Sequence, residues 1–157
     1  MEDYEYALDF DCVGLKDNGI IPIENTGRGQ DKSPEFIIWN LSPKAVTIAI
    51  TLEDLSHPIR EFTHWVIWNI PAGNRVKGGI PAGKILPQWG NAQQGFAYGR
   101  HRYAGPKPPR RTTHLYRYTV YVLDCRLKLS SRTTKKGFLK QAEPHIIQAG
   151  SVLGEFE

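Results

Sequence analysis

The sequence predicts a mainly β fold, and three observations support this prediction. Residues 44–52, 62–70 and 114–124 are runs rich in β-branched and aromatic residues, and turn-forming residues bound them. Residues 71–112 contain many glycines and prolines with little periodicity, which is typical of a long connecting region that builds a site. Only one short helix is predicted, over residues 130–143.

The strands are expected in the following order along the chain. Residues 35–40 and 44–52 flank the turn signal Leu-Ser-Pro, so we expect them to pair as a hairpin. Residues 62–70 end at Pro-Ala-Gly, and residues 114–124 form the longest β-type run. We expect both of these runs to be central strands.

The sequence of residues 130–157 predicts a helix followed by a strand. Residues 130–143 begin with Ser and Thr residues suited to an N-cap, and Pro144 would stop the helix. The alternation of Val152, Gly154 and Phe156 then favours a closing strand.

Length and composition predict one soluble domain over residues 1–157. The chain starts with acidic residues and has no apolar run long enough for a signal or a membrane span, so we expect a cytoplasmic protein. Cys12 and Cys125 lie far apart without a CxxC pair, which argues against a disulfide framework and a zinc knuckle. We expect two ordinary thiols.

Positive charge is concentrated in one part of the chain. Residues 100–140 contain 12 Lys and Arg but only one acidic residue, Asp124. Such a region could meet nucleic acid, an anionic membrane or an acidic partner, although a solvated basic face is the plainer interpretation.

Strand alternation predicts a polar cluster at one end of the core. Side chains two residues apart share a face of a strand, so the three runs would each present one set inward. These sets are Ile48, Ile50, Leu52 and Asp54; Phe62, His64, Val66 and Trp68; and His114, Tyr116, Tyr118, Val120 and Val122. If the strands are neighbours, Asp54, His64, His114 and Tyr116 meet. Buried polar groups need hydrogen-bond partners. Each of these four side chains could find its partner in the neighbouring backbone and side chains, or all four could close around a small anion.

Two catalytic interpretations of this cluster have weaker support. A hydrolase could use Ser56 with a nearby histidine, but the sequence has no GxSxG motif. Asp54, His64 and His114 could bind zinc, but no HxH or HExxH spacing supports a metal site. We therefore expect no catalytic residues, no metal and no cofactor.

Four motifs in order resemble one known family. They are SPEF…W (33–39), EDLSHP…FTHWVIWNIPAG (53–73), YAGPKPP (103–109) and HLYRYTVYVLD (114–124). Over residues 20–157 the chain resembles the phosphatidylethanolamine-binding protein family, and most of all its bacterial Raf-kinase-inhibitor-like branch. Residues 1–19 match nothing in it and are taken as an N-terminal extension of uncertain role.

The resemblance implies a large antiparallel sheet packed on a smaller one, with one or two short peripheral helices. It also implies a small pocket for phosphate, phosphorylethanolamine or other anions. Carried over by position, the ligand-binding residues are Asp54, His64, Gly105, Pro106, His114 and Tyr116, and we place Ser56, Pro58, Phe62 and Tyr103 at the rim. The chain departs from the family at Ser56, where the family has a second aspartate, and at Leu115, where it has an arginine.

We therefore predict a non-enzymatic module that binds a small anion or a phospholipid head group. Imidazole N–H groups, the Tyr116 hydroxyl and backbone amides of residues 103–106 would hold the anion, and Asp54 would orient a histidine and raise its pKa. A kinase or other protein partner and a homodimer are left open. The alternatives are a weak hydrolase using the same Asp/His/His pocket and a nucleic-acid binder using residues 100–117, whose Arg and Lys alternate with Tyr.

Overall fold

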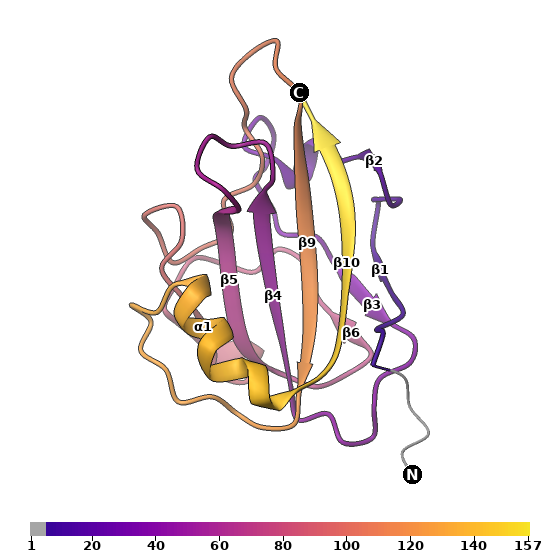
Figure 1. Ribbon diagram of the computed structural model, residues 1–157, viewed down its shortest axis with the longest axis vertical. Helices are drawn as coiled ribbons and strands as arrows, with labels where there is room; N and C mark the ends of the chain where they lie inside the picture. Colours follow the sequence, from indigo (N-terminus) through magenta and orange to yellow (C-terminus); the bar gives the residue numbers. More distant parts are fainter. Residues whose placement is uncertain (1–5) are drawn as a thin grey trace.

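The structure is a computed structural model that describes residues 6–157, and two β-sheets dominate it (Figure 1). The large sheet has the strand order β2-β10-β9-β4-β5-β8-β7, and the small sheet has the order β1-β3-β6. The strands of the large sheet are β2 (Gly19–Ile20), β10 (Ile146–Phe156), β9 (His114–Leu123), β4 (Thr47–Asp54), β5 (Phe62–Pro71), β8 (Ala92–Gln94) and β7 (Ile85–Leu86). Those of the small sheet are β1 (Phe10–Cys12), β3 (Phe36–Ile38) and β6 (Arg75–Val76). The predicted mainly β fold, with a large and a smaller sheet, is confirmed.

Helical structure is short. The α-helix α1 (Lys135–Ala142) is accompanied by the 3-10 turns η1 (Ile23–Asn25), η2 (Pro87–Trp89) and η3 (Glu143–His145). No helix in residues 6–157 has both the length and the apolar character that a membrane span requires.

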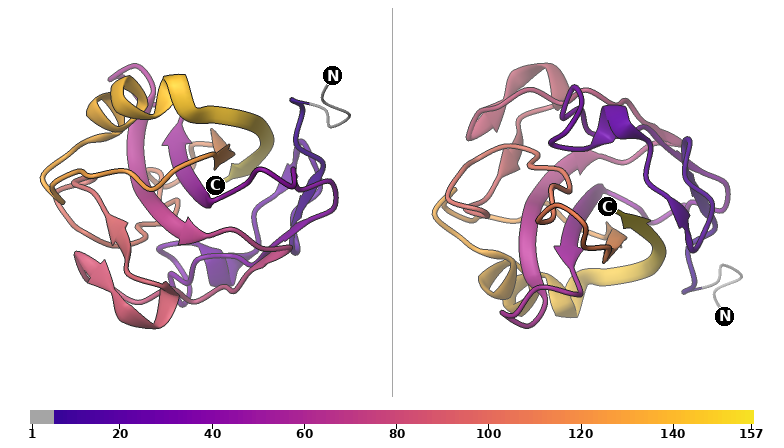
Figure 2. Two further views of the ribbon diagram at one scale, coloured as in Figure 1. Left: turned by 90° about the horizontal axis from the view of Figure 1, so that it is seen from below. Right: turned by 90° about the horizontal axis from the view of Figure 1, so that it is seen from above.

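Two hydrophobic cores cover the two faces of the large sheet. The core between the sheets joins β4 and β9 to β3, and the rings of Phe36 and Tyr118 meet there at 6.1 Å. On the other face, Phe138 of α1 stacks on Trp68 of β5 at 5.9 Å. Figure 2 shows α1 and the small sheet on opposite sides of the large sheet. The large sheet is therefore the middle layer.

The two runs expected to be central are central. β5 pairs with β4 and β8, and β9 pairs with β4 and β10. The closing strand is also present, because β10 pairs along the whole of β9.

The predicted hairpin of residues 35–40 and 44–52 is wrong. β3 pairs with β1 and β6 in the small sheet, whereas β4 lies in the large one. The segment between them is held by Gln148 of β10, whose side chain accepts from the Ser42 amide at 2.8 Å and donates to the Asn40 carbonyl at 2.8 Å. This segment contains a turn, closed by a hydrogen bond from the Ala45 amide to the Ser42 carbonyl at 3.0 Å, but it leads from one sheet to the other instead of joining two paired strands.

The helix is shorter than predicted. It starts at Lys135 and not at residue 130, because Ser130 and Thr133 form a separate turn with a hydrogen bond from the Thr133 amide to the Ser130 carbonyl. Helix α1 ends at Ala142, and Pro144 lies in the 3-10 turn η3 that follows.

A β-bulge in β5 changes the faces expected for that strand. Leu52 is paired with Trp65 but Glu53 is paired with Thr63, so β5 has one extra residue, His64. The prediction that Phe62, His64, Val66 and Trp68 share a face is therefore wrong. Val66 and Trp68 belong to the core under α1, and Trp65 and Ile67 point into the core between the sheets.

Candidate functional site

The expected polar cluster lies where β4 ends and β5 and β9 begin, at the upper end of these strands in Figure 1. Antiparallel pairing places Asp54 between Phe62 on one neighbour and Tyr116 on the other. The bulge at His64 leaves this imidazole on the same side, where its ring lies 5.6 Å from that of Tyr116. The His114 ring lies 6.2 Å from Tyr116. The structure thus brings Asp54, His64, His114 and Tyr116 together.

Asp54 orients His114. Its Oδ2 lies 2.7 Å from Nδ1 of His114, and its Oδ1 accepts from the Ser56 amide at 2.9 Å. Because a carboxylate accepts, Nδ1 of His114 carries the proton of this hydrogen bond. The side chains of Asp54 and His114 are only 4% and 14% exposed, so solvent weakens this pair little.

His64 is fixed by backbone and aromatic contacts. Its Nδ1 lies 2.8 Å from the Ala104 carbonyl, and because a carbonyl only accepts, Nδ1 carries a proton. The ring also meets Tyr98 at 4.7 Å and Phe62 at 5.7 Å. Burial lowers the pKa of His64 and outweighs the opposing effects of the Ala104 carbonyl and Asp54. Our expectation that Asp54 raises a histidine pKa therefore does not describe the net shift at His64.

Among the four side chains of this cluster, Tyr116 has an unusual environment for a polar group. It is fully buried, and its hydroxyl has no hydrogen-bond partner among the described residues. Burial and the nearby Asp54 raise the pKa of Tyr116, so the phenol remains protonated and can donate. A buried hydroxyl without a partner costs about 1–3 kcal/mol, which a ligand at this point would recover.

The Gly105-Pro106 segment forms the wall beside His64. The Gly105 amide donates to Oδ1 of Asp31 at 2.7 Å, so this amide is already engaged and is not free to hold an anion as expected. A Cβ on residue 105 would come within 2.4 Å of the Asn25 carbonyl oxygen, which explains the glycine. The Pro106 carbonyl accepts from the Gly27 amide at 2.8 Å. The segment is therefore tied to residues 25–31.

The residues expected at the rim fall into two groups. Ser56 and Pro58 are exposed, and Phe62 is half-buried beneath the stacked ring of His57 at 4.2 Å. Tyr103 instead lies in the interior, where its hydroxyl donates to the Asn25 carbonyl at 2.6 Å and lies 2.6 Å from the Tyr118 hydroxyl.

Comparison with known proteins shows the family to which the chain belongs. The family model described as phosphatidylethanolamine-binding protein matches residues 14–157. The chain belongs to the phosphatidylethanolamine-binding protein family. A UPF0098 protein of Pyrococcus abyssi is 37% identical to it over 139 residues, which cover 87% of this chain and 78% of the relative. A UPF0098 protein of Methanothermobacter thermautotrophicus is 32% identical over 141 residues, with 89% and 92% covered.

Two solved structures share the phosphatidylethanolamine-binding protein fold with this chain. A homolog of that protein from Chlamydia trachomatis has a TM-score of 0.81 at 24% identity, over 98% of this chain and 99% of its own. Escherichia coli YbcL, described as a member of the mammalian family, has a TM-score of 0.80 at 19% identity, over 96% and 98%. At these low sequence identities, the comparison shows a shared fold alone.

The departure at Ser56 has a structural explanation. The phosphatidylethanolamine-binding protein pattern has an aspartate there, and here the Ser56 hydroxyl accepts from the Leu115 amide at 2.9 Å. A serine can thus fix the loop to β9 without adding a negative charge at the site.

Three residues near the site were not predicted. Tyr98 covers His64 and has a positive φ of 52°, Asp31 holds the Gly105 amide, and Arg28 donates to the Pro108 carbonyl. Their contacts join segments far apart in sequence, and none of the three lies in a strand whose alternation could have revealed it.

A group of potential metal ligands lies elsewhere. Within residues 6–157, the one set of three whose donor atoms lie within 4.8 Å of one another is Asp124, Cys125 and His145. It is near the opposite end of β9, and Asp124 Oδ1 and His145 Nδ1 already lie 3.0 Å apart in an exposed pair. Asp54, His64 and His114 form no such set.

Proposed function

We propose that this protein binds a small oxyanion between His64, His114 and Tyr116. The ligand would be phosphate or the phosphate of a phosphomonoester or lipid head group. The observation that carries the proposal is the buried Tyr116 hydroxyl, which has no partner among the described residues, on a ring that lies 5.6 Å from the His64 ring and 6.2 Å from the His114 ring. An anion would accept from this hydroxyl and remove the cost of its burial.

The two imidazoles set the protonation of the complex. Each uses Nδ1 within the protein, so Nε2 is the nitrogen we assign to the ligand. Nε2 donates only when the ring is cationic, and otherwise it accepts. Anion binding would therefore be accompanied by uptake of a proton, or the ligand would supply its own O–H, as hydrogenphosphate does. Asp54 would hold the His114 ring in the orientation that presents Nε2 to the ligand.

The nucleic-acid alternative has less support. Of the four tyrosines considered for stacking on bases, Tyr103, Tyr116 and Tyr118 are buried, and Tyr98 is exposed. Base stacking needs exposed rings, so Tyr98 alone of these four could stack while the basic residues contact a phosphate chain. A site for a single small anion explains the same tyrosines better.

The decisive experiment follows the five histidines by NMR during a phosphate titration. We expect the ring signals of His64 and His114 to shift together and saturate, because both would contact the anion. His101 and His145 serve as internal controls, since they lie outside the cluster. His114→Ala should weaken binding at least about tenfold, which corresponds to about 1.4 kcal/mol. Uniform, unsaturated shifts of all histidines would contradict the proposal.

A further inference from the structure

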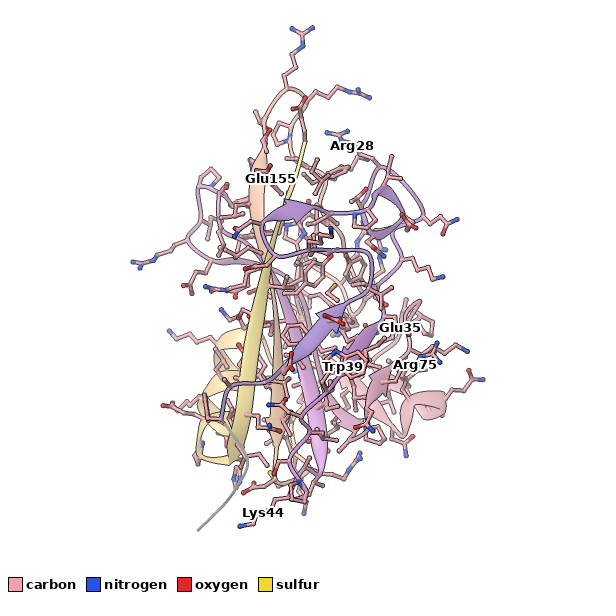
Figure 3. The ribbon with its side chains drawn as sticks, turned by 90° about the vertical axis from the view of Figure 1, so that its right-hand side faces the viewer. Arg28, Glu35, Trp39, Lys44, Arg75 and Glu155 are labelled. Carbon is pink, nitrogen blue, oxygen red and sulfur yellow. The ribbon has the colours of Figure 1, made fainter. Side chains whose placement is uncertain are left out.

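A second basic hollow lies beside the candidate anion site. It has a volume of about 360 Å³ and is lined by Arg28, Arg110, Arg111 and Glu157. Figure 3 shows Arg28 at the upper end of the molecule, the end at which β9 begins. Three guanidinium groups share this hollow with one acidic residue, Glu157, whose side-chain carboxylate and chain-terminal carboxylate leave an excess of positive charge.

The arginines are held there by the backbone. Arg28 donates to the Pro108 carbonyl, and the neighbouring Gly27 amide donates to the Pro106 carbonyl. Arg110 and Arg111 lie in the turn closed by a hydrogen bond from the Thr112 amide to the Pro109 carbonyl at 3.1 Å. This turn therefore fixes the backbone that carries both arginines.

Arg110 and Arg111 differ from other arginines of the chain in their ion pairing. Within the part of the chain that the structure describes, neither forms an ion pair, whereas Arg75, Arg102 and Arg117 each pair with a carboxylate. Glu157 accepts from Thr113 at 3.4 Å. The hollow thus keeps an excess of positive charge, which a bound anion would neutralise.

Residues of the hollow are close neighbours of the candidate site along the chain and across the sheet. Thr113, which contacts Glu157, directly precedes His114, and Phe156 is paired with His114 in the sheet. Arg28 also acts electrostatically on Tyr116 and opposes the burial that raises the pKa of this phenol. One ligand of modest length could therefore reach both places.

We propose that Arg28, Arg110 and Arg111 form a second anion subsite, and that the ligand is a small molecule with two phosphoryl groups. One group would lie between His64, His114 and Tyr116, and the other in the arginine hollow. This inference rests on the proposed function. Guanidinium groups suit the second position because their fork of N–H donors matches a phosphoryl group.

The test compares phosphomonoesters with alkanediol bisphosphates of increasing length by calorimetry. Joining two bound groups raises affinity through effective concentration, so the best bisphosphate should bind at least about tenfold more tightly than its monophosphate. R110A/R111A should abolish this preference, and phosphate should still shift the ring signals of His64 and His114 in this variant. Arg28 is kept because it also holds Pro108. The matched control R132A/K136A removes two exposed positive charges near α1 and should preserve the preference.

The outcomes separate this inference from the proposed function. If monophosphate shifts His64 and His114 but no bisphosphate binds more tightly, the second subsite is wrong and the first stands. An equal loss in R132A/K136A would also overturn it, because general charge would then explain the preference. If monophosphate leaves both histidines unchanged, the proposed function fails, and the second subsite fails with it.

A soluble bisphosphate and a phosphorylated lipid head group share this chemistry. Co-sedimentation with phosphatidylcholine vesicles containing a phosphatidylinositol phosphate distinguishes the two sources. Sedimentation that R110A/R111A loses and R132A/K136A keeps assigns the lipid source. Tight binding of a soluble bisphosphate without sedimentation assigns the soluble one.

Discussion

Two polar clusters occupy opposite faces of the large sheet at β4 and β9, and they differ in whether their buried polar groups are all paired. Glu53 and Asp54 are consecutive in β4, and across the sheet they are paired with Arg117 and Tyr116. The carboxylate of Glu53 is buried, and both of its oxygens are paired. Its Oε1 lies 3.0 Å from Nη2 of Arg117, and its Oε2 contacts Nζ of Lys135. On the other face, the cluster of Asp54 leaves the Tyr116 hydroxyl without a partner among the described residues.

Comparing the two clusters shows which buried polar groups indicate a ligand-binding site. Glu53, Glu61, Arg117 and Lys135 balance in charge and satisfy one another, and Lys135 is the first residue of α1. This cluster anchors the helix to the sheet. The Asp54 cluster is also buried and polar, but among the described residues no acceptor meets its Tyr116 hydroxyl. Burial alone does not distinguish the two clusters, whereas an unmet hydrogen bond does.

The largest expected effect is on the closed cluster. Glu53→Ala should lower the free energy of unfolding by about 3 kcal/mol, because it leaves Lys135 and Arg117 partly buried without their common partner. Urea denaturation measures this loss. Phosphate affinity should not change, since Glu53 faces away from Tyr116.

Glu61→Ala is the matched control for that change. Glu61 belongs to the same cluster but is about half exposed, so its loss should cost less than about 1 kcal/mol. If Glu53→Ala were no more destabilising than Glu61→Ala, or if it abolished phosphate binding, the distinction between a structural and a functional cluster would be wrong.

A smaller effect is expected from acidification. The pKa of His64 is lowered in the folded protein, so below about pH 6.5 the unfolded state binds a proton that the folded state does not. The free energy of unfolding should therefore fall as pH decreases through this range, by at most about 1.4 kcal/mol per pH unit. Asp54 opposes the lowering, and His57 adds to it.

Urea denaturation over a pH series measures the slope, and His64→Asn provides the reference. Asn can still donate to the Ala104 carbonyl but does not titrate, so the difference between the two proteins isolates His64. Phosphate should reduce the difference, because an anion stabilises the imidazolium. An ordinary or raised pKa of His64 without ligand would contradict the expectation.

The comparison also shows what the sequence could reveal. Alternation along β9 predicted that His114 and Tyr116 share a face, since no bulge interrupts residues 114–122. The same rule failed in β5, because the bulge at His64 depends on how β4 pairs with it. The alternation rule still placed His64 on the side of Asp54 and Tyr116, because the extra residue of the bulge is His64 itself.

Contacts between distant segments explain the remaining failures. The hairpin was predicted from a local turn signal, but Gln148 holds that segment from more than a hundred residues away. Asp31 and Tyr98 act on the site through contacts that no local pattern encodes. The four ordered family motifs led us to expect that Asp54, His64, His114 and Tyr116 lie together, and the structure brings these side chains together because such motifs record a spatial arrangement.

The smallest effect on stability, and the most informative contrast, is expected at Tyr116. Tyr116→Phe removes a hydroxyl that has no partner, so the free energy of unfolding should stay the same or rise by up to about 1 kcal/mol. Tyr118→Phe removes a hydroxyl that lies 2.6 Å from Tyr103, so it should lower the stability by about 1 kcal/mol. In phosphate binding the order reverses: Tyr116→Phe should lose affinity, and Tyr118→Phe should keep it. Two neighbouring tyrosines of one strand would then separate stability from binding, and a loss of stability in Tyr116→Phe would show that its hydroxyl has a structural role.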